Sequence, residues 1–387
     1  MNILVLGNGF DLAHDLPTSY RAFLDFTKAY EKYKDVCMAG ESVKEEWEKA
    51  DEANREFIVY FANLCDRKKK LFVELNELTI NNLWLKHFYD VRIKQGWIDF
   101  ESEISRIIQI LESVRIQVIE EKKAGKLVIH VPKYQEEALQ GFRVDNTIIE
   151  SLKFVDGTKE RLHDDLNRLI RCLEIYLCDY VGNIEIENKH PDIEGLPIID
   201  KVLSFNYTNT YEKVYAKNPY IEYDYIHGRA TIENTVDSNN MVLGIDEYLN
   251  GDARNENIEF IEFKKFFQRI HKETGCLYRN WVDVIESGQA ISETIAIYKE
   301  QEKTVRETKQ VNFHKVFFFG HSLDVTDKDV IRDMILSNKV KTTIFYRDKA
   351  DYGQKITNLV KIIGQDELIK RTGGANKSIY FKEITKG

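Results

Sequence analysis

The spacing of short apolar runs along this chain constrains its fold more than any other feature. Ile3–Leu6 is one such run, and the next convincing one, Val202–Phe205, comes only after a long intervening segment. In that segment apolar residues recur at spacings of three and four while acids and bases fill the other face, which predicts amphipathic helices. The helices are expected over Glu41–Asp66, Leu71–Lys94, Phe100–Glu121 and Lys159–Tyr180. A break at Lys126–Val131 is interpreted as a small hairpin strand.

After residue 200 the pattern changes to short runs that are rich in β-branched and aromatic residues. These predicted strands are Val202–Phe205, Tyr223–Ile226, Met241–Leu243, Val316–Phe319, Thr342–Tyr346 and Ser378–Phe381. Helical patterns lie between several of them, at Ile258–Lys272, Asp327–Ser337 and Asp351–Ile363. Near-continuous apolar strands that alternate with helices favour a parallel sheet covered on both faces.

The sequence therefore predicts an α/β protein with a Rossmann-like, mostly parallel sheet. A large all-helical insertion separates its first and second strands. We expect the sheet domain to comprise residues 1–35 and 196–387, and the mainly helical insertion to comprise residues 36–195.

Composition limits the classes of function. The chain has 387 residues and a net charge of −9, which argues against sequence-independent binding to nucleic acid, because such binding depends on basic surface. Its five cysteines are an odd number and widely spaced, as expected in a reducing compartment without structural zinc. No segment has the pattern of a secretory signal or a membrane span, so we expect a cytoplasmic protein with no membrane association.

The residues that directly follow the predicted strands are the first candidates for a binding site. In an open parallel sheet, ligands bind outside the carboxyl ends of the strands. Here those positions hold glycine, asparagine, histidine and aspartate instead of the lysine and glutamate of ordinary loops. The segments are Gly7-Asn8-Gly9-Phe10-Asp11, Asn206-Tyr207-Thr208-Asn209, His227-Gly228, Gly244-Ile245-Asp246 and Gly320-His321-Ser322-Leu323-Asp324.

The first of these segments resembles the start of a dinucleotide-binding fingerprint. Gly7 and Gly9 would let the backbone turn tightly and approach a phosphate at the start of a helix. Leu12 stands where the fingerprint has its third glycine, so a plain turn between strand and helix explains the segment equally well. Asp11 is either a catalytic neighbour of a ribose or an acid favoured near a helix start. Thr18 or Ser19 is expected to cap the helix that follows.

Asn206 and His227 are more informative together than apart. Alone, Asn206 would be a turn residue and His227 a buried, hydrogen-bonded side chain. An amide and an imidazole at one sheet edge are suited to hold a ribose and activate a hydroxyl group or water. Farther along the chain, Asp324 and Asp327 fit helix capping better than metal binding, and no metal site is predicted.

Several of these motifs together resemble the bacteriophage abortive-infection AbiH family, over nearly the whole chain. They are the block from Gly7 to Tyr20, Trp97-x-Asp99-x-Glu101, Phe205-Asn206-Tyr207-Thr208, Ile226-His227-Gly228 and Gly320-His321-Ser322-Leu323. The resemblance implies a role in the defence of a bacterial cell against phage, and it supplies no mechanism.

A second, more distant resemblance does supply one. The order of a glycine turn, an Asn after a later strand, His-Gly and Gly-x-Ser is similar to the sirtuin (SIR2-like) arrangement of the NAD-binding fold. This implies that Gly7 and Gly9 face the pyrophosphate, that Asn206 holds the ribose or the attacking water, and that His227 is a general base or ribose partner. Gly320 and Ser322 would contact the adenosine half, and Asp11 would stabilise positive charge. The remaining expected ligand contacts are the neighbours Asn8, Phe10, Thr208 and Gly228.

Two departures from sirtuins decide which reaction is expected. The zinc cysteines are missing, which argues against deacetylation, and Thr208 stands where sirtuins have an acid. We therefore expect an abortive-infection effector that binds NAD or a related nucleotide and hydrolyses it to nicotinamide and ADP-ribose. The insertion would serve sensing, lid formation or self-assembly, with a second copy or another defence protein as partner. A catalytically silent nucleotide sensor or scaffold is the alternative, followed by a nuclease.

Overall fold

The computed structural model describes residues 1–40, 42–95, 99–126, 130–143, 148–216, 218–287, 292–293, 310–311, 313–375 and 377–385. Trp97 and the centre of the predicted hairpin strand, 127–129, lie outside these residues. The chain divides into two compact units, and each is described by itself. The sheet unit comprises Met1–Asp15, Ile186–Ile226 and Gly275–Gly387, and the helical unit comprises Leu16–Glu185 and His227–Thr274. Neither unit is shown to fold alone, so the domain boundaries stay a prediction.

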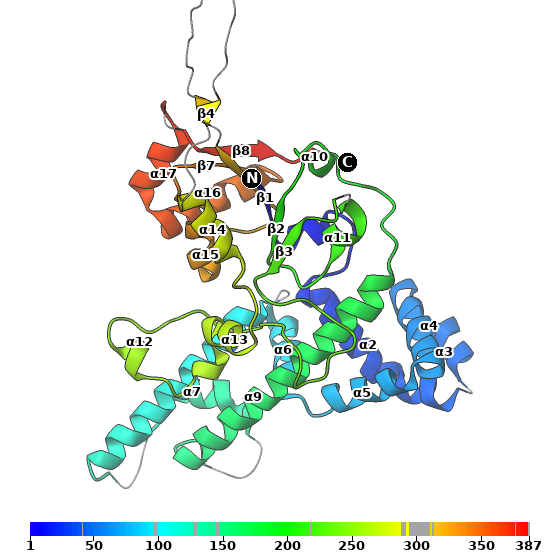
Figure 1. The fold of residues 1–387 in the computed structure, drawn as a ribbon. Coiled ribbons are helices and arrows are strands. Elements are labelled where there is room, and N and C mark those ends of the chain that lie inside the picture. The colour runs from blue at the N-terminus through cyan, green and yellow to red at the C-terminus, as the bar shows by residue number, and fades with distance from the viewer. Residues whose placement is uncertain are drawn as a thin grey trace, which may run out of the picture. The chain divides into compact units, whose positions relative to one another are not determined.

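A six-stranded parallel sheet forms the centre of the sheet unit (Figure 1). Its strands are β1 Asn2–Leu6, β2 Lys201–Ser204, β3 Glu222–Tyr225, β6 His314–Phe319, β7 Val340–Tyr346 and β8 Ile379–Glu383. They lie in the order β3-β2-β1-β6-β7-β8, and every neighbouring pair is parallel. This is the doubly wound order of Rossmann-like folds, in which the chain runs outward from a central strand first to one side and then to the other. The predicted fold class is confirmed.

The sheet is covered on both faces, as its near-continuous apolar strands predict. Along β1, Ile3 and Val5 join one buried cluster, while Leu4 and Leu6 join the other. Because side chains alternate between the faces of a strand, a fully apolar strand supplies both cores. The first cluster takes apolar side chains from α14 Tyr278–Ser287, α15 Lys328–Ile335, α16 Lys349–Ile363 and α17 Gln365–Thr372. The second takes them from α1 Gly9–Leu12, α10 Pro191–Glu194 and α11 Thr210–Tyr215.

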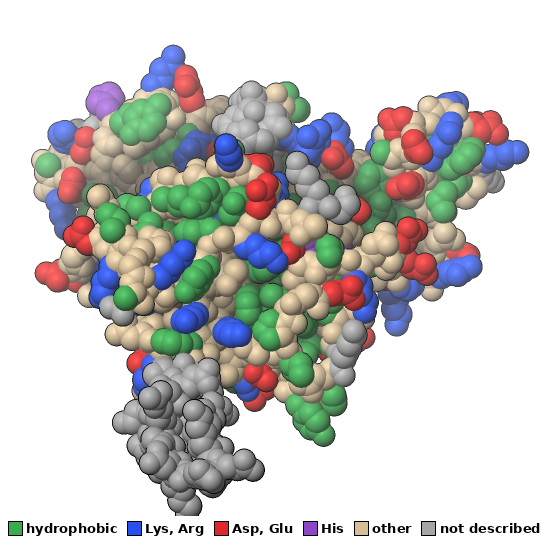
Figure 2. Space-filling model, turned by 90° about the horizontal axis from the view of Figure 1, so that it is seen from above, with side chains coloured by type: hydrophobic (Ala, Val, Ile, Leu, Met, Phe, Trp, Pro, Cys, Tyr) green, Lys and Arg blue, Asp and Glu red, His purple; other side chains and the backbone are tan. Residues whose placement is uncertain are grey.

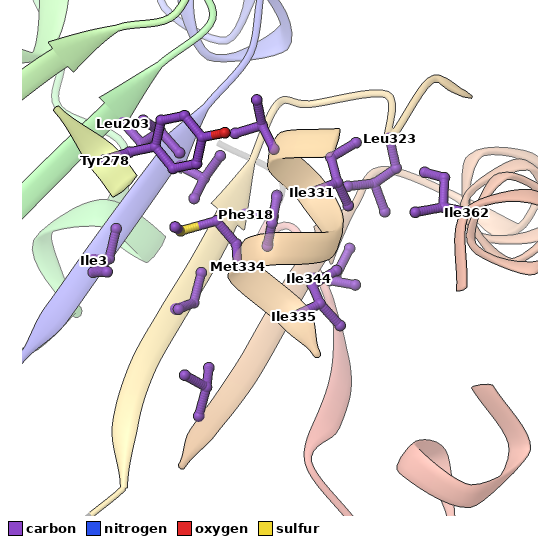
Figure 3. Packing of buried hydrophobic residues seen from close by; sticks show 14 of the residues in the cluster. Ile3, Leu203, Tyr278, Phe318, Leu323, Ile331, Met334, Ile335, Ile344 and Ile362 are labelled. Atoms are coloured by element: carbon purple, nitrogen blue, oxygen red, sulfur yellow. The ribbon is translucent and has the colours of Figure 1, made fainter. Parts of the chain in front are cut away.

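Figure 3 shows the first of these cores. Ile331, Met334 and Ile335 extend from one face of α15 toward the strand side chains of Phe318 and Ile344 (Figure 3). Each of these five side chains has no more than 1% of its surface exposed. Full burial of one such side chain stabilises a fold by roughly 1.5–3 kcal/mol, so this packing holds α15 against the sheet. A short antiparallel pair, β4 Ser292–Glu293 with β5 Gln310–Val311, lies outside the main sheet.

The helical unit contains helices in each of the segments predicted to be helical, together with helices that were not predicted, such as α8 Lys133–Leu139 and α12 Ala253–Glu256. Its other α-helices are α2 Tyr20–Ala39, α3 Val43–Lys49, α4 Glu52–Arg67, α5 Lys69–Thr79, α6 Leu83–Gln95, α7 Phe100–Lys123, α9 Leu152–Ile175 and α13 Lys265–His271. Between β1 and β2 the described residues form helices and no strand, as predicted for the insertion. Ser19 caps α2 by accepting a hydrogen bond from the Ala22 amide, which confirms one of the two expected caps.

The prediction of a strand at Met241–Leu243 is wrong, because side chains satisfy the backbone there. Gln268 accepts from the Leu243 amide at 3.1 Å and donates to the Leu243 carbonyl at 3.3 Å. Lys272 donates to the Met241 carbonyl at 2.6 Å, and Asn239 accepts from the Met241 amide at 2.7 Å. Buried backbone groups need partners, and side chains can supply them in place of a sheet neighbour.

Candidate functional site

Three glycines bring the turn after β1 against the turn after β6. A Cβ atom on Gly7 would lie 2.5 Å from the Cα of His321, and one on Gly9 would lie 2.8 Å from the Cα of Gly320. A Cβ on Gly320 would lie 2.1 Å from the Phe10 nitrogen, and Gly320 also has a φ of +71°, which favours glycine. The two turns therefore interlock at a distance that only glycine permits.

This close packing also uses the amide groups that could face a phosphate. The Gly7 amide donates to the Phe319 carbonyl at 3.1 Å, and the Gly9 amide donates to the Gly320 carbonyl at 2.8 Å. The Phe10 amide donates to the Gly7 carbonyl at 2.8 Å, and the Phe10 ring is buried in the second core. The tight turn that Gly7-Asn8-Gly9 indicates is present, and its glycines have a structural explanation that needs no ligand.

Asp11 lies at the carboxyl edge of β1 and is fully buried. Its Oδ2 accepts a hydrogen bond of 2.6 Å from the Thr208 hydroxyl, and Thr210 in turn donates to the Thr208 oxygen at 3.2 Å. Its Oδ1 has no hydrogen-bond partner among the described residues. A buried carboxylate oxygen without a partner is costly, so it marks a position where a ligand or water would bind.

Asn206 follows β2 and lies beside Asp11 at the same edge of the sheet. Its backbone is fixed by Ser204, whose Oγ accepts from the Asn206 amide at 3.1 Å and donates to the Asn206 carbonyl at 3.0 Å. The side chain is 6% exposed, and its Oδ1 also has no partner among the described residues. The structure brings the side chains of Asp11, Asn206 and Thr208 together at the ends of β1 and β2.

A small cavity lies among these residues. It has about 10 Å³ available to the centre of a water molecule, which is about the size that holds one water. Its lining residues are Leu6, Phe10, Asp11, Val202, Ser204, Asn206, Thr208, Thr210, Tyr211, Tyr223 and Tyr225. The cavity therefore combines two unpartnered acceptors with three tyrosine side chains.

Burial raises the pKa of Asp11 above its ordinary value of 3.8. The side chains of Thr208, Thr210 and Asn206 and the charge of His14 act in the opposite direction and offset part of this rise. A carboxyl group with a raised pKa accepts a proton more readily, which suits a general base.

His14 belongs to the same edge, and the sequence analysis did not select it. Its Nδ1 lies 2.7 Å from the Phe10 carbonyl, so this nitrogen carries the proton and donates. Its Nε2 lies 2.6 Å from the Tyr215 hydroxyl, which also accepts from the His190 amide at 2.6 Å. His14 stands three residues after Asp11, and helical spacing was the signal that could have paired the two.

The segment after β6 is held by α16. Lys355 donates to the His321 carbonyl at 2.6 Å, and Asn358 donates to the Ser322 carbonyl at 3.1 Å. The His321 ring packs on Phe205 with centroids 4.2 Å apart, which joins the ends of β6 and β2. Ser322 is exposed next to this fixed segment, while Gly320 is placed within the glycine interlock.

His227 and Gly228 come directly after the sheet unit in the chain and belong to the helical unit. The His227 carbonyl accepts from the Val242 amide at 2.8 Å, and a Cβ on Gly228 would lie 2.1 Å from the Asn240 carbonyl oxygen. The loop that follows is held by the fully buried Glu174, which accepts from the Thr231 amide at 2.9 Å. His227 is thus buried in a well-anchored loop, and its proposed catalytic role stays a prediction.

The sequence matches the family described as bacteriophage abortive infection AbiH over residues 3–347. The chain belongs to this family. Membership supports a role in bacteriophage abortive infection. No curated protein and no solved structure matches the chain.

Other residues of the AbiH motifs have structural roles in the described part of the chain. Asp99 caps α7 by accepting from the Glu101 amide at 3.2 Å and from the Ser102 hydroxyl at 2.6 Å. Glu101 forms an ion pair of 2.7 Å with the buried Lys265. Asp324 accepts from the Thr326 amide at 3.0 Å, which confirms its expected capping role.

Three broader features complete the description of this AbiH family member. Among the described residues, no three His, Cys, Asp or Glu side chains are grouped so that they could hold a metal ion. Within the same residues, no helix is long and apolar enough to cross a membrane. Basic and acidic side chains are interspersed on the face shown in Figure 2.

Proposed function

We propose that this AbiH protein acts in abortive infection by binding NAD or a related nucleotide at the carboxyl edge of its sheet and hydrolysing it. The observation that carries the proposal is a pair of buried acceptors, Asp11 Oδ1 and Asn206 Oδ1, which line one small cavity and have no partner among the described residues. They follow β1 and β2 of a sheet with the doubly wound strand order, in which nucleotides bind outside the carboxyl ends of the strands.

The residues at this edge of the sheet fit the ribose part of such a nucleotide. The acceptors of Asp11 and Asn206 suit the hydroxyl groups of a ribose. The amides of Gly7 and Gly9 are already hydrogen-bonded, and the backbone of Gly320 and His321 fills the space beside these glycines, so they offer a phosphate no donor. The exposed Ser322 is the proposed contact for the adenosine half, in keeping with the order of motifs in SIR2-like domains.

The proposed reaction is hydrolysis of the N-glycosidic bond. A water oxygen forms a bond to C1′ of the ribose while the bond from C1′ to the pyridinium nitrogen breaks. The bonding electron pair goes to that nitrogen, so nicotinamide leaves as a neutral molecule, and the water loses one proton. Asp11 is the proposed acceptor of this proton, and its negative charge would stabilise the positive charge that develops on the ribose. Asn206 would orient the water or the ribose.

The test is release of nicotinamide from NAD by the purified full-length protein, alone and in lysate from phage-infected cells. We expect Asp11→Asn to lower the rate at least about 100-fold, because a positioned proton acceptor contributes about that much or more. Asn206→Ala should also lower the rate, because the water or the ribose loses the group that orients it. Asp224→Asn is the matched control: Asp224 is a buried aspartate of the same unit that accepts from the Tyr278 amide at 2.8 Å. The same measurement on His227→Ala tests separately whether His227 is the general base or ribose partner that the sequence predicts.

Three outcomes separate the candidates. Nicotinamide release that depends on Asp11 and Asn206 but not on Asp224 supports hydrolysis. Tight NAD binding without turnover in any condition supports the alternative of a catalytically silent sensor, which the small volume of the cavity favours. No binding and no turnover would refute both.

A further inference from the structure

The cavity lined by Asp11 and Asn206 offers two hydrogen-bond acceptors that no described residue satisfies. Asp11 is 0% exposed and Asn206 is 6% exposed, and each has an Oδ1 atom without a partner among the described residues. Two acceptors at this depth call for a group that donates hydrogen bonds.

The hydroxyl groups of Thr208, Thr210 and Ser204 cannot serve such a ligand as donors, because each has a single proton and already uses it. Thr210 donates to Thr208, and Thr208 donates to Asp11 Oδ2. Ser204 donates to the Asn206 carbonyl. The first two bonds form a chain that ends on one oxygen of the carboxyl group and leaves the other facing the cavity. Thr208 and Thr210 therefore decide which oxygen of Asp11 is available.

The size and charge of the cavity limit which hydrogen-bond donor of a ligand can bind in it. About 10 Å³ for the centre of a water molecule admits one group the size of water, and a hydroxyl group has that size. A phosphate is larger, carries negative charge, and offers mainly acceptors. It would meet a carboxylate and an amide oxygen, both of which disfavour an anion at close range.

We infer that this cavity receives a ribose hydroxyl group of the nucleotide and excludes its phosphates, and that Thr208 and Thr210 are positioning residues for Asp11. The inference rests on the proposed function and narrows it. It gives Thr208 a different role from the direct ligand contact expected from sequence, and it assigns a role to Thr210.

The test measures binding of NAD and of two NAD analogues, each without the 2′ and 3′ hydroxyl groups of one ribose. We expect one analogue to bind the wild type roughly 10- to 100-fold more weakly than NAD, the loss typical of a hydrogen bond to a charged group. In Asp11→Ala this loss should become smaller, because Asn206 Oδ1 is then the remaining acceptor of the pair. Equal binding of NAD and both analogues to the wild type would overturn the inference, as would an undiminished loss in Asp11→Ala.

A second probe separates this inference from the proposed function. Methyl β-D-ribofuranoside and inorganic pyrophosphate are titrated separately at millimolar concentration and followed by NMR. We expect the riboside to bind in a manner that depends on Asp11, and pyrophosphate binding to be unchanged by Asp11→Ala. If NAD fails to bind but the riboside binds in this way, the proposed function fails and the inference stands. If the riboside does not bind, or binds Asp11→Ala equally well, the inference fails.

The positioning role has its own readout, the ratio of affinities for NAD and the weaker analogue. Thr208→Ser keeps the hydroxyl group and should keep this ratio, while Thr208→Val should reduce it toward one. Thr210→Val should reduce it less, because Thr210 acts through Thr208. A ratio unchanged in Thr208→Val would overturn the positioning role, and the Ser variant controls for loss of folding.

Discussion

Gly320→Ala is the substitution that most directly tests the interlock between the turns after β1 and β6. The added Cβ would lie 2.1 Å from the Phe10 nitrogen and 2.5 Å from the Gly9 carbonyl carbon, which are backbone atoms that cannot move independently of the turn. Overpacking of this kind costs about 1–3 kcal/mol. A non-glycine residue at the φ of +71° adds about 1–3 kcal/mol. The expected loss in free energy of unfolding is therefore roughly 2–6 kcal/mol.

The assay is urea unfolding followed by circular dichroism, with the midpoint of the transition that includes the sheet unit as the readout. Gly353→Ala is the matched control. It lies in the exposed part of α16 of the same unit, and a Cβ there would have no atom within 4 Å. We expect that control to be neutral or stabilising by up to about 1 kcal/mol, since alanine favours a helix over glycine. A loss below about 1 kcal/mol for Gly320→Ala would refute the interlock.

Three further predictions concern buried polar groups. Glu174→Ala should destabilise the helical unit by about 3–5 kcal/mol, because Arg171 keeps only its ion pair with Glu74 and the Thr231 amide and Asn234 side chain lose their acceptor. Limited proteolysis should then cut within 229–240, and unchanged resistance would contradict this. Tyr215→Phe should cost about 1–3 kcal/mol, since His14 Nε2 and the His190 amide both lose a partner; an unchanged melting temperature would contradict it. Burial raises the pKa of Asp11 in the folded state above 3.8, so folding favours the protonated carboxyl group. The stability that this group contributes is present below pH 3.8 and is lost as the pH rises through its pKa in the folded state. Asparagine stays neutral, so the melting temperature of Asp11→Asn relative to wild type should rise between pH 4 and pH 7, and a fall would refute the assignment.

Sequence patterns were sufficient for the six strands of the main sheet. Runs such as Ile3–Leu6 and Val316–Phe319 are apolar on both faces, and only a sheet covered on both sides buries them fully. Met241–Leu243 has the same composition but is not a strand. The side chains of Gln268 and Lys272 take its backbone hydrogen bonds, and no local pattern could reveal that.

The candidate site was predictable in its location and not in its contacts. The rule that ligands bind at the carboxyl ends of strands selected Asp11, Asn206 and Thr208. The hydrogen bond from Thr208 to Asp11 joins residues 197 positions apart, and sequence alone could not show that it leaves one carboxylate oxygen unpartnered. The structural role of Gly7 and Gly9 could not be predicted either, because it depends on contact with the segment at Gly320, which is far from both in the sequence.

The central claim is that the carboxyl edge of this sheet holds a nucleotide at Asp11 and Asn206. Calorimetric titration of NAD into the wild type, Asn206→Ala and the Asp224→Asn control tests it most directly. The account predicts that the wild type and Asp224→Asn bind NAD with the same affinity, and that Asn206→Ala binds at least about 10-fold more weakly, as expected when one buried hydrogen-bonding partner is lost. Equal affinity in all three proteins, or no binding to the wild type, would contradict it.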